Sequence, residues 1–138
     1  MRSEKGEGRS KDGNLIKTKS TEFAIRIINL CNYLKQNKKE YSLAEQLLRS
    51  GTSIGANYRE SQNASSKKDF LNKISIALKE ANETEYWLEL LLKTNYITEA
   101  EYKSIYKDCD ELVRLLTSSV KSAKDKRNGS EERSGDDF

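Results

Sequence analysis

Histidine and proline are absent from this chain of 138 residues, and cysteine occurs only twice. Histidine is the commonest metal ligand and general base, so its absence argues against a conventional zinc site, a di-iron carboxylate site and an imidazole-activated nucleophile. The chain also lacks the motifs GxxxxGK[ST] and GxGxxG that bind nucleotides. The sequence therefore predicts a protein that is not an enzyme and that holds no metal or cofactor.

Long apolar runs are also missing. No window approaches the roughly 18 apolar residues that a membrane span requires, and the N-terminal segment MRSEKGEGRSK lacks the apolar stretch of a signal peptide. Cys31 and Cys109 each fall on the apolar stripe of a predicted helix, where reduced, buried thiols are expected rather than a disulfide. We therefore expect a cytoplasmic protein with no membrane partner.

The small excess of positive charge is unevenly distributed. The formal net charge is +3, from 25 basic and 22 acidic residues, and residues 1–19 hold six of the basic and three of the acidic ones. Both ends of the chain are rich in glycine, serine and charge and poor in large apolar residues, which is typical of disorder. The predicted organisation is a disordered basic tail at 1–17, a folded domain at 18–124 and a disordered charged tail at 125–138.

Four segments with the apolar spacing of amphipathic helices fill the predicted domain. They span about 20–36, 42–63, 66–94 and 98–124. The connections between them are short, and short connections make sequential helices antiparallel neighbours. The sequence thus predicts an all-α fold, an antiparallel up-down-up-down four-helix bundle.

Sequence patterns also predict where the helices begin. Ser42 with Glu45, and Thr98 with Glu101, match the capping-box pattern, in which a hydroxyl and a carboxylate satisfy each other's backbone N–H groups. A serine at position 65 or 66 is expected to cap the third helix.

The second helix contains a surface built for close packing. In the stretch RSGTSIGANYRES, Gly51, Ile54, Gly55 and Tyr58 share one helical face. Each glycine inside a helix costs about 1 kcal/mol relative to alanine, so two of them four residues apart indicate that a neighbouring backbone comes close.

Several large apolar residues lie off the stripes that would form the bundle core. On the first helix these are Ile25 and Ile28, and on the third they are Ile76, Trp87 and Leu90. They could cover the end of the bundle, bind a helix of a partner or join identical subunits. Contact between subunits is favoured, because two helices carry the surplus and large aromatic residues are common interface anchors.

A polar cluster is predicted inside the bundle. Glu85 falls within the apolar stripe of the third helix, and a buried carboxylate must be paired, hydrogen-bonded or protonated. Ser53 and Asn57 of the second helix could supply donors across the bundle and so fix the helix register. Alternatively, a local rotation lets Glu85 reach water.

Five basic residues gather around the end of the second helix and the start of the third. These candidate nucleic-acid contacts are Arg49, Arg59, Lys67, Lys68 and Lys73. They could bind phosphates. A solvated rim, diluted by Glu60 and Asp69, is the favoured reading of the same cluster.

Two segments carry a family resemblance. The stretches SxxEQLLRSGTSIGANYRE at 42–60 and KKDFLNKISIALKEANETEYWL at 67–88 resemble the bacterial 23S ribosomal RNA intervening-sequence proteins, over about residues 20–122. That family is similar in fold to the accessory variability protein of diversity-generating retroelements, a pentameric helical barrel that works with a reverse transcriptase. The resemblance implies a homopentameric ring and no catalytic residues.

Two functions remain open from the sequence. The first is an oligomeric helical scaffold that binds RNA or a nucleic-acid enzyme through its basic rim and tail. The second is an interaction module that recognises only protein. A steep salt dependence of RNA binding would distinguish them.

Overall fold

Four helices make up the part of the chain that the structure describes. This computed structural model describes the backbone of residues 11–136 and the side chains of residues 13–126. The helices are α2 (Lys11–Asn37), α3 (Ser42–Gln62), α4 (Lys67–Lys93) and α5 (Glu99–Asp136), and no strand occurs among the described residues. The predicted all-α fold is confirmed. The disorder predicted for residues 1–10 and 137–138 lies outside the described residues.

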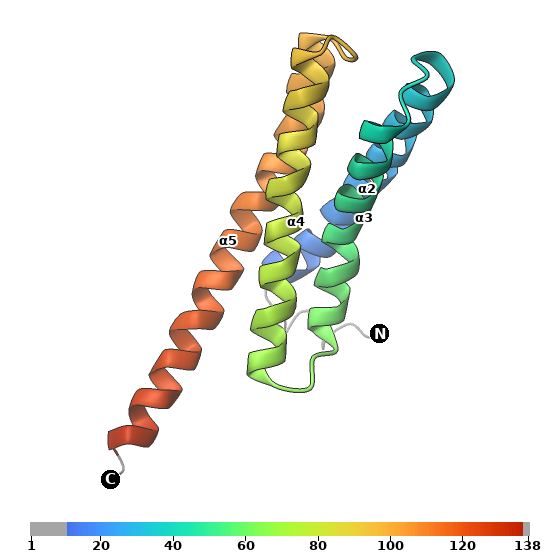
Figure 1. Cartoon of the computed structure of the whole chain (residues 1–138). Helices are drawn as coiled ribbons and strands as arrows, with labels where there is room; N and C mark the ends of the chain where they lie inside the picture. The colour runs from blue at the N-terminus through green and yellow to red at the C-terminus, as the bar shows by residue number, and fades with distance from the viewer. Residues whose placement is uncertain (1–10, 137–138) are drawn as a thin grey trace.

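The helices run alternately up and down, and each packs against its neighbours in the sequence (Figure 1). Helix α5 also returns to pack against α2, so that α2 and α4 lie on opposite corners of the bundle. The pairs α2–α3 and α4–α5 diverge toward the end that carries their connecting turns, whereas α5 continues beyond the opposite end (Figure 1). Each helix therefore has two partners and one outward face.

Two predicted boundaries are wrong. Helix α2 begins at Lys11 rather than near residue 20, because Ile16 continues the buried stripe and the Tyr58 hydroxyl donates a hydrogen bond of 3.0 Å to the Gly13 carbonyl. Helix α5 continues to Asp136 rather than ending near residue 124. Its last part contains no proline that would stop it.

Of the two predicted capping boxes, one forms and the other does not. Thr98 and Glu101 form theirs, with the Thr98 N–H donating to the Glu101 carboxylate at 2.8 Å and the Glu101 N–H donating to the Thr98 hydroxyl at 3.1 Å. The box predicted for Ser42 and Glu45 is wrong, since the Leu43 N–H donates to the Glu40 carboxylate instead. Glu45 forms an ion pair with Lys35 of α2. Ser66 caps α4 as predicted.

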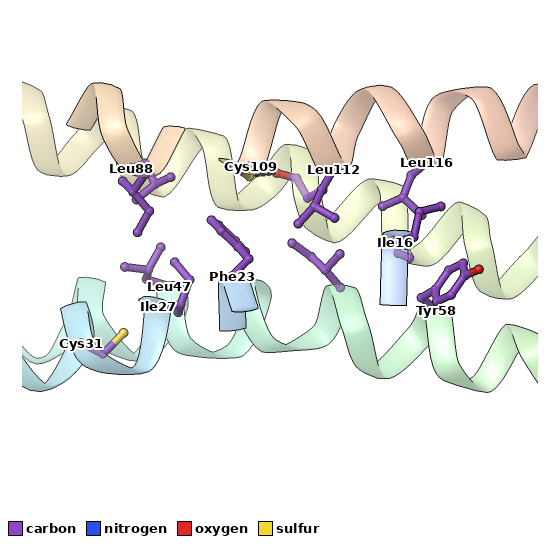
Figure 2. Packing of buried hydrophobic residues seen from close by; sticks show 14 of the residues in the cluster. Ile16, Phe23, Ile27, Cys31, Leu47, Tyr58, Leu88, Cys109, Leu112 and Leu116 are labelled. Atoms are coloured by element: carbon purple, nitrogen blue, oxygen red, sulfur yellow. Dashed lines mark hydrogen bonds between the residues drawn. The ribbon is translucent and has the colours of Figure 1, made fainter. Parts of the chain in front are cut away.

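Apolar side chains from all four helices meet along the bundle axis (Figure 2). Both cysteines are free and belong to this core, as predicted, and their thiols donate to the backbone carbonyls of Ala44 and Ala81. Burial raises the pKa of Cys31 to about 11, and it also raises the pKa of Cys109. Thiolates are therefore scarce at neutral pH, which makes both cysteines structural. The buried apolar residues are Ile16, Phe23, Ile27, Cys31, Leu34, Ala44, Leu47, Ile54, Tyr58, Leu71, Ile74, Ala77, Ala81, Leu88, Leu91, Ile97, Ile105, Cys109, Leu112, Leu116 and Val120.

The glycine face of α3 packs against α2, which confirms the predicted close approach. A Cβ atom placed on Gly51 would lie 2.8 Å from Cγ1 of Ile27, a fully buried side chain. One placed on Gly55 would lie 3.1 Å from the Ser20 hydroxyl oxygen. Distances below 3 Å require a neighbour to move, and Ile27 has no room in the packed core. Gly51 is therefore fixed by the position of α2.

We predict that Gly51→Ala destabilises the fold although alanine favours helices. Overpacking a core typically costs about 1–3 kcal/mol, which outweighs the gain in helix propensity of about 1 kcal/mol. Urea unfolding measures the change. Ala56→Gly is the control, because Ala56 is exposed on α3 and there the loss of propensity alone should destabilise by about 1 kcal/mol. A more stable Gly51→Ala variant would contradict the close approach.

Candidate assembly surface

The outward face of α4 carries an apolar patch. Ile76 is 40% exposed and Tyr86 is 53% exposed, while Trp87 and Leu90 are half-buried. Glu80 and Glu83 lie between Ile76 and Trp87 along α4. The rings of Tyr86 and Trp87 lie 5.2 Å apart at a tilted angle, a favourable aromatic arrangement. We call Ile76, Tyr86, Trp87 and Leu90 the α4 patch. Three of these residues were predicted from the sequence, whereas Tyr86 was missed. Its position directly before Trp87 could have indicated that it belongs to the same surface.

A second apolar patch lies on α2. Ile25 is 54% exposed and Ile28 is 42% exposed. Ile25 lies opposite the buried stripe of α2, whereas Ile28 shares a face with Thr21 and Lys35, which contact α3. We call these two residues the α2 patch. Because α2 and α4 occupy opposite corners of the bundle, the two patches are separate surfaces. The structure therefore exposes all of the predicted interface residues at least in part, but on two separate surfaces of one molecule.

An ion-pair network holds the tryptophan of the α4 patch. The indole N–H of Trp87 donates a hydrogen bond of 3.0 Å to the Glu83 carboxylate. Arg49 of α3 pairs with that carboxylate and, at 3.1 Å, with Glu80. The network fixes the direction of the indole before any partner arrives, which lowers the entropy cost of forming an interface.

The structure separates the five predicted nucleic-acid contacts into two groups. Arg49 is engaged with α4 as described, Lys73 pairs with Glu60 at 2.9 Å, and Arg59 donates to the Thr21 hydroxyl at 3.0 Å. Lys67 and Lys68 are exposed, and neither forms an ion pair with any described side chain. The first group mainly ties helices together, and only the second group is fully available to a ligand.

The predicted cluster of Ser53, Asn57 and Glu85 does not form. The Ser53 hydroxyl donates to the Arg49 carbonyl at 2.6 Å, and the Asn57 amide donates to the Ser53 carbonyl at 2.9 Å, so both satisfy themselves within α3. The buried polar contact between α3 and α4 is instead a pair of hydroxyls, those of Ser50 and Thr84, 2.9 Å apart. Short hydroxyl side chains can bond across a close helix contact where a longer carboxylate does not fit.

Glu85 lies against α5 rather than α3. Its Oε2 atom is buried and has no hydrogen-bond partner. Burial raises the pKa of this carboxyl above its ordinary value, and the Asp110 carboxylate of α5 raises it further. Burial also raises the pKa of Tyr102 and of Tyr106. The charges of Glu89 and Glu85 raise the pKa of Tyr102 further, and the charge of Glu85 does the same for Tyr106. The folded state therefore disfavours the ionised form of Glu85 at the α4–α5 contact.

Two further structural properties bear on function. No helix among the described residues is long and apolar enough to cross a membrane. Within the same part of the chain, no group of three or more Cys, Asp or Glu residues is arranged to hold a metal ion.

We predict that Glu85→Gln stabilises the protein at pH 7. A carboxyl with a raised pKa in the folded state opposes folding when it is ionised, and this penalty disappears below its unfolded value near 4.5. The gain in the urea midpoint should therefore shrink as the pH falls toward that value. Glu89→Gln is the control, because Glu89 is an exposed carboxylate one turn further along α4. A Glu85→Gln variant less stable than the wild type at pH 7 would contradict the assignment.

Comparisons with known proteins agree with the four-helix architecture. The family model described as 23S rRNA-intervening sequence protein matches residues 13–118. A crystal structure of a protein of unknown function from the S23 ribosomal protein family of Bacteroides thetaiotaomicron is 56% identical in sequence, with a TM-score of 0.79. The match covers 80% of this chain and 98% of that one. No curated protein matches. The chain belongs to the 23S rRNA-intervening sequence protein family.

Proposed function

We propose that the protein is a non-enzymatic scaffold that assembles into a closed ring of identical subunits. The observation that carries this proposal is the pair of apolar patches on opposite corners of one bundle. In the ring, the α2 patch of each subunit packs on the α4 patch of the next. A ring of five is the number that the resemblance to the pentameric retroelement protein implies.

The arrangement of the patches favours a ring over a simple dimer. A two-fold dimer uses the same surface on both subunits and would bury only one of the two patches. A head-to-tail contact between unlike patches buries both, and it closes into a ring when the rotation between neighbours fits. The ring is thus the arrangement that leaves neither patch exposed to water.

Association is favourable only if all residues of both patches are buried in the contact. Burying an isoleucine side chain fully contributes about 1.5–3 kcal/mol, whereas association costs about 4–15 kcal/mol in lost freedom. No single exposed isoleucine can offset that cost. Trp87, already fixed by Glu83 and Arg49, supplies a large anchor without further ordering.

The proposed partner of the ring is RNA or a nucleic-acid enzyme. The family is described by its occurrence with 23S rRNA intervening sequences, and Lys67 and Lys68 remain free to contact phosphates. The alternative is a ring that recognises only protein. The neutral charge balance of residues 20–120, which hold fourteen basic and fourteen acidic side chains, favours this alternative.

Two single substitutions test the ring and its direction. We predict that Ile25→Glu and Ile76→Glu each convert the assembly to monomers, because each places a charge in every contact of a head-to-tail ring. Light scattering coupled to size exclusion gives the mass directly. If like patches met instead, each variant would lose one kind of contact and stop at dimers.

The control is Tyr41→Glu. Tyr41 is equally exposed but lies at the N-terminal end of α3, in the turn that connects it to α2, away from both patches. This variant should assemble like the wild type. A monomeric wild type at micromolar concentration would overturn the ring, and assembly of both isoleucine variants would show that the patches are not the interface.

A further inference from the structure

A cavity of about 430 Å³ lies at the end of the bundle where α3 connects to α4. It is formed by the first turn of α4 and by the part of α5 that runs on past that connection (Figure 1). The volume is within the range of about 300–1,000 Å³ that is usual for sites of small ligands. Its lining residues are Lys67, Phe70, Ser118, Ser119, Ser122, Ala123 and Lys126.

The α5 wall of the cavity has a regular pattern. Ser118, Ser122 and Lys126 follow one another at intervals of four residues, so their side chains form a row along one helix face. Ser119 lies beside this row. The hydroxyls of Ser118, Ser119 and Ser122 form no hydrogen bond with any described residue. The Thr117 hydroxyl, in contrast, donates to the Val113 carbonyl at 2.6 Å. Hydroxyl donors are thus available next to a lysine.

The α4 wall supplies a second cation and an aromatic ring. Lys67 is the first residue of α4, where the helix dipole adds positive potential. Phe70 follows one turn later and is only half-buried, so part of its ring lines the cavity. Neither Lys67 nor Lys126 forms an ion pair with a described side chain.

Positive charge continues around the cavity. Lys68 lies next to Lys67, and Lys121 and Lys124 line the adjoining hollow on the other side of α5. The acidic groups nearby are Asp69, whose carboxylate accepts the Ser65 N–H, and Asp125. Five lysines and only two carboxylates give this end of the bundle a positive surface, although residues 20–120 hold equal numbers of basic and acidic side chains.

We propose that this cavity binds single-stranded RNA, with a phosphate held between Lys67 and Lys126 by the serine hydroxyls and a base stacked on Phe70. Two cations and a row of hydroxyl donors match the several acceptor oxygens of a phosphate group. An exposed aromatic ring beside a cationic groove is the usual means of binding unpaired bases. The proposal takes its partner class from the proposed function but does not depend on the ring.

The same features favour RNA over an acidic protein segment. A carboxylate side chain would use the lysines but would give the Phe70 ring no flat partner to stack on. A duplex is also a poor occupant, because its bases are stacked inside and cannot reach a concave pocket. The occupant that uses the lysines, the hydroxyls and the ring together is a single strand.

The test uses the full chain and a fluorescently labelled single-stranded oligouridylate, measured by anisotropy over a range of salt concentrations. We predict that the double variant Lys67→Ala with Lys126→Ala binds at least about tenfold more weakly. The slope of log affinity against log salt should fall by about 0.7, since the two lysines hold one phosphate and each phosphate contact on a single strand contributes about 0.7. Phe70→Leu, which keeps the apolar volume, should weaken binding by about 5- to 150-fold through lost stacking.

The matched control is Lys93→Ala with Lys107→Ala. It removes the same charge from exposed, unpaired lysines near the opposite end of α4 and α5. It should leave the affinity within about twofold, and light scattering should give the same mass for all variants. Equal losses in both double variants, no RNA binding by the wild type, or equal competition by an oligoglutamate would each overturn the proposal, and the mass measurement reports separately on the ring.

Discussion

The contact between Gly51 of α3 and Ile27 of α2 is the constraint on which the rest of the bundle depends. Because Ile27 fills the space that a side chain on α3 would need, the two helices approach closely and the remaining core residues pack around them. On the other flank of α3, the hydroxyl of Ser50 meets that of Thr84 of α4. Helix α3 is thus tied to both of its neighbours.

The outward faces of α2 and α4 explain how a bundle with a complete core can still carry apolar residues on its surface. Ile25 and Ile76 belong to helices that are each flanked on two sides, so no further rotation within one molecule could bury them. In the proposed ring, a second copy of the chain covers them. The network of Arg49, Glu83 and Trp87 shows the same specialisation, since it holds the indole of a surface residue in one orientation.

Charge is used in two different ways in this protein. At the contact between α3 and α4, basic groups such as Arg49 and Lys73 pair with carboxylates of the neighbouring helix and stabilise the contact between elements. At the end of the bundle, Lys67 and Lys126 face a cavity without an acidic partner among the described residues. This end of the bundle thus carries a local positive surface, although residues 20–120 hold equal numbers of basic and acidic side chains. The proposed assembly and the proposed RNA binding therefore use different parts of the molecule.

The sequence by itself determined the helix number, the short connections, the glycine face, the capping box at Thr98 and the surplus apolar residues, because these depend on local propensity and on periodicity along one helix. It did not determine which helix a given side chain faces. Glu85 was expected to meet Ser53 and Asn57 but lies against Asp110, and Arg49 was expected to be free but is paired with α4. It also missed the early start of α2, because the contact between Tyr58 and Gly13 joins residues far apart in the chain. Such pairings were decided only by the tertiary structure, since the rotation of each helix about its axis is fixed by the packing of all four together.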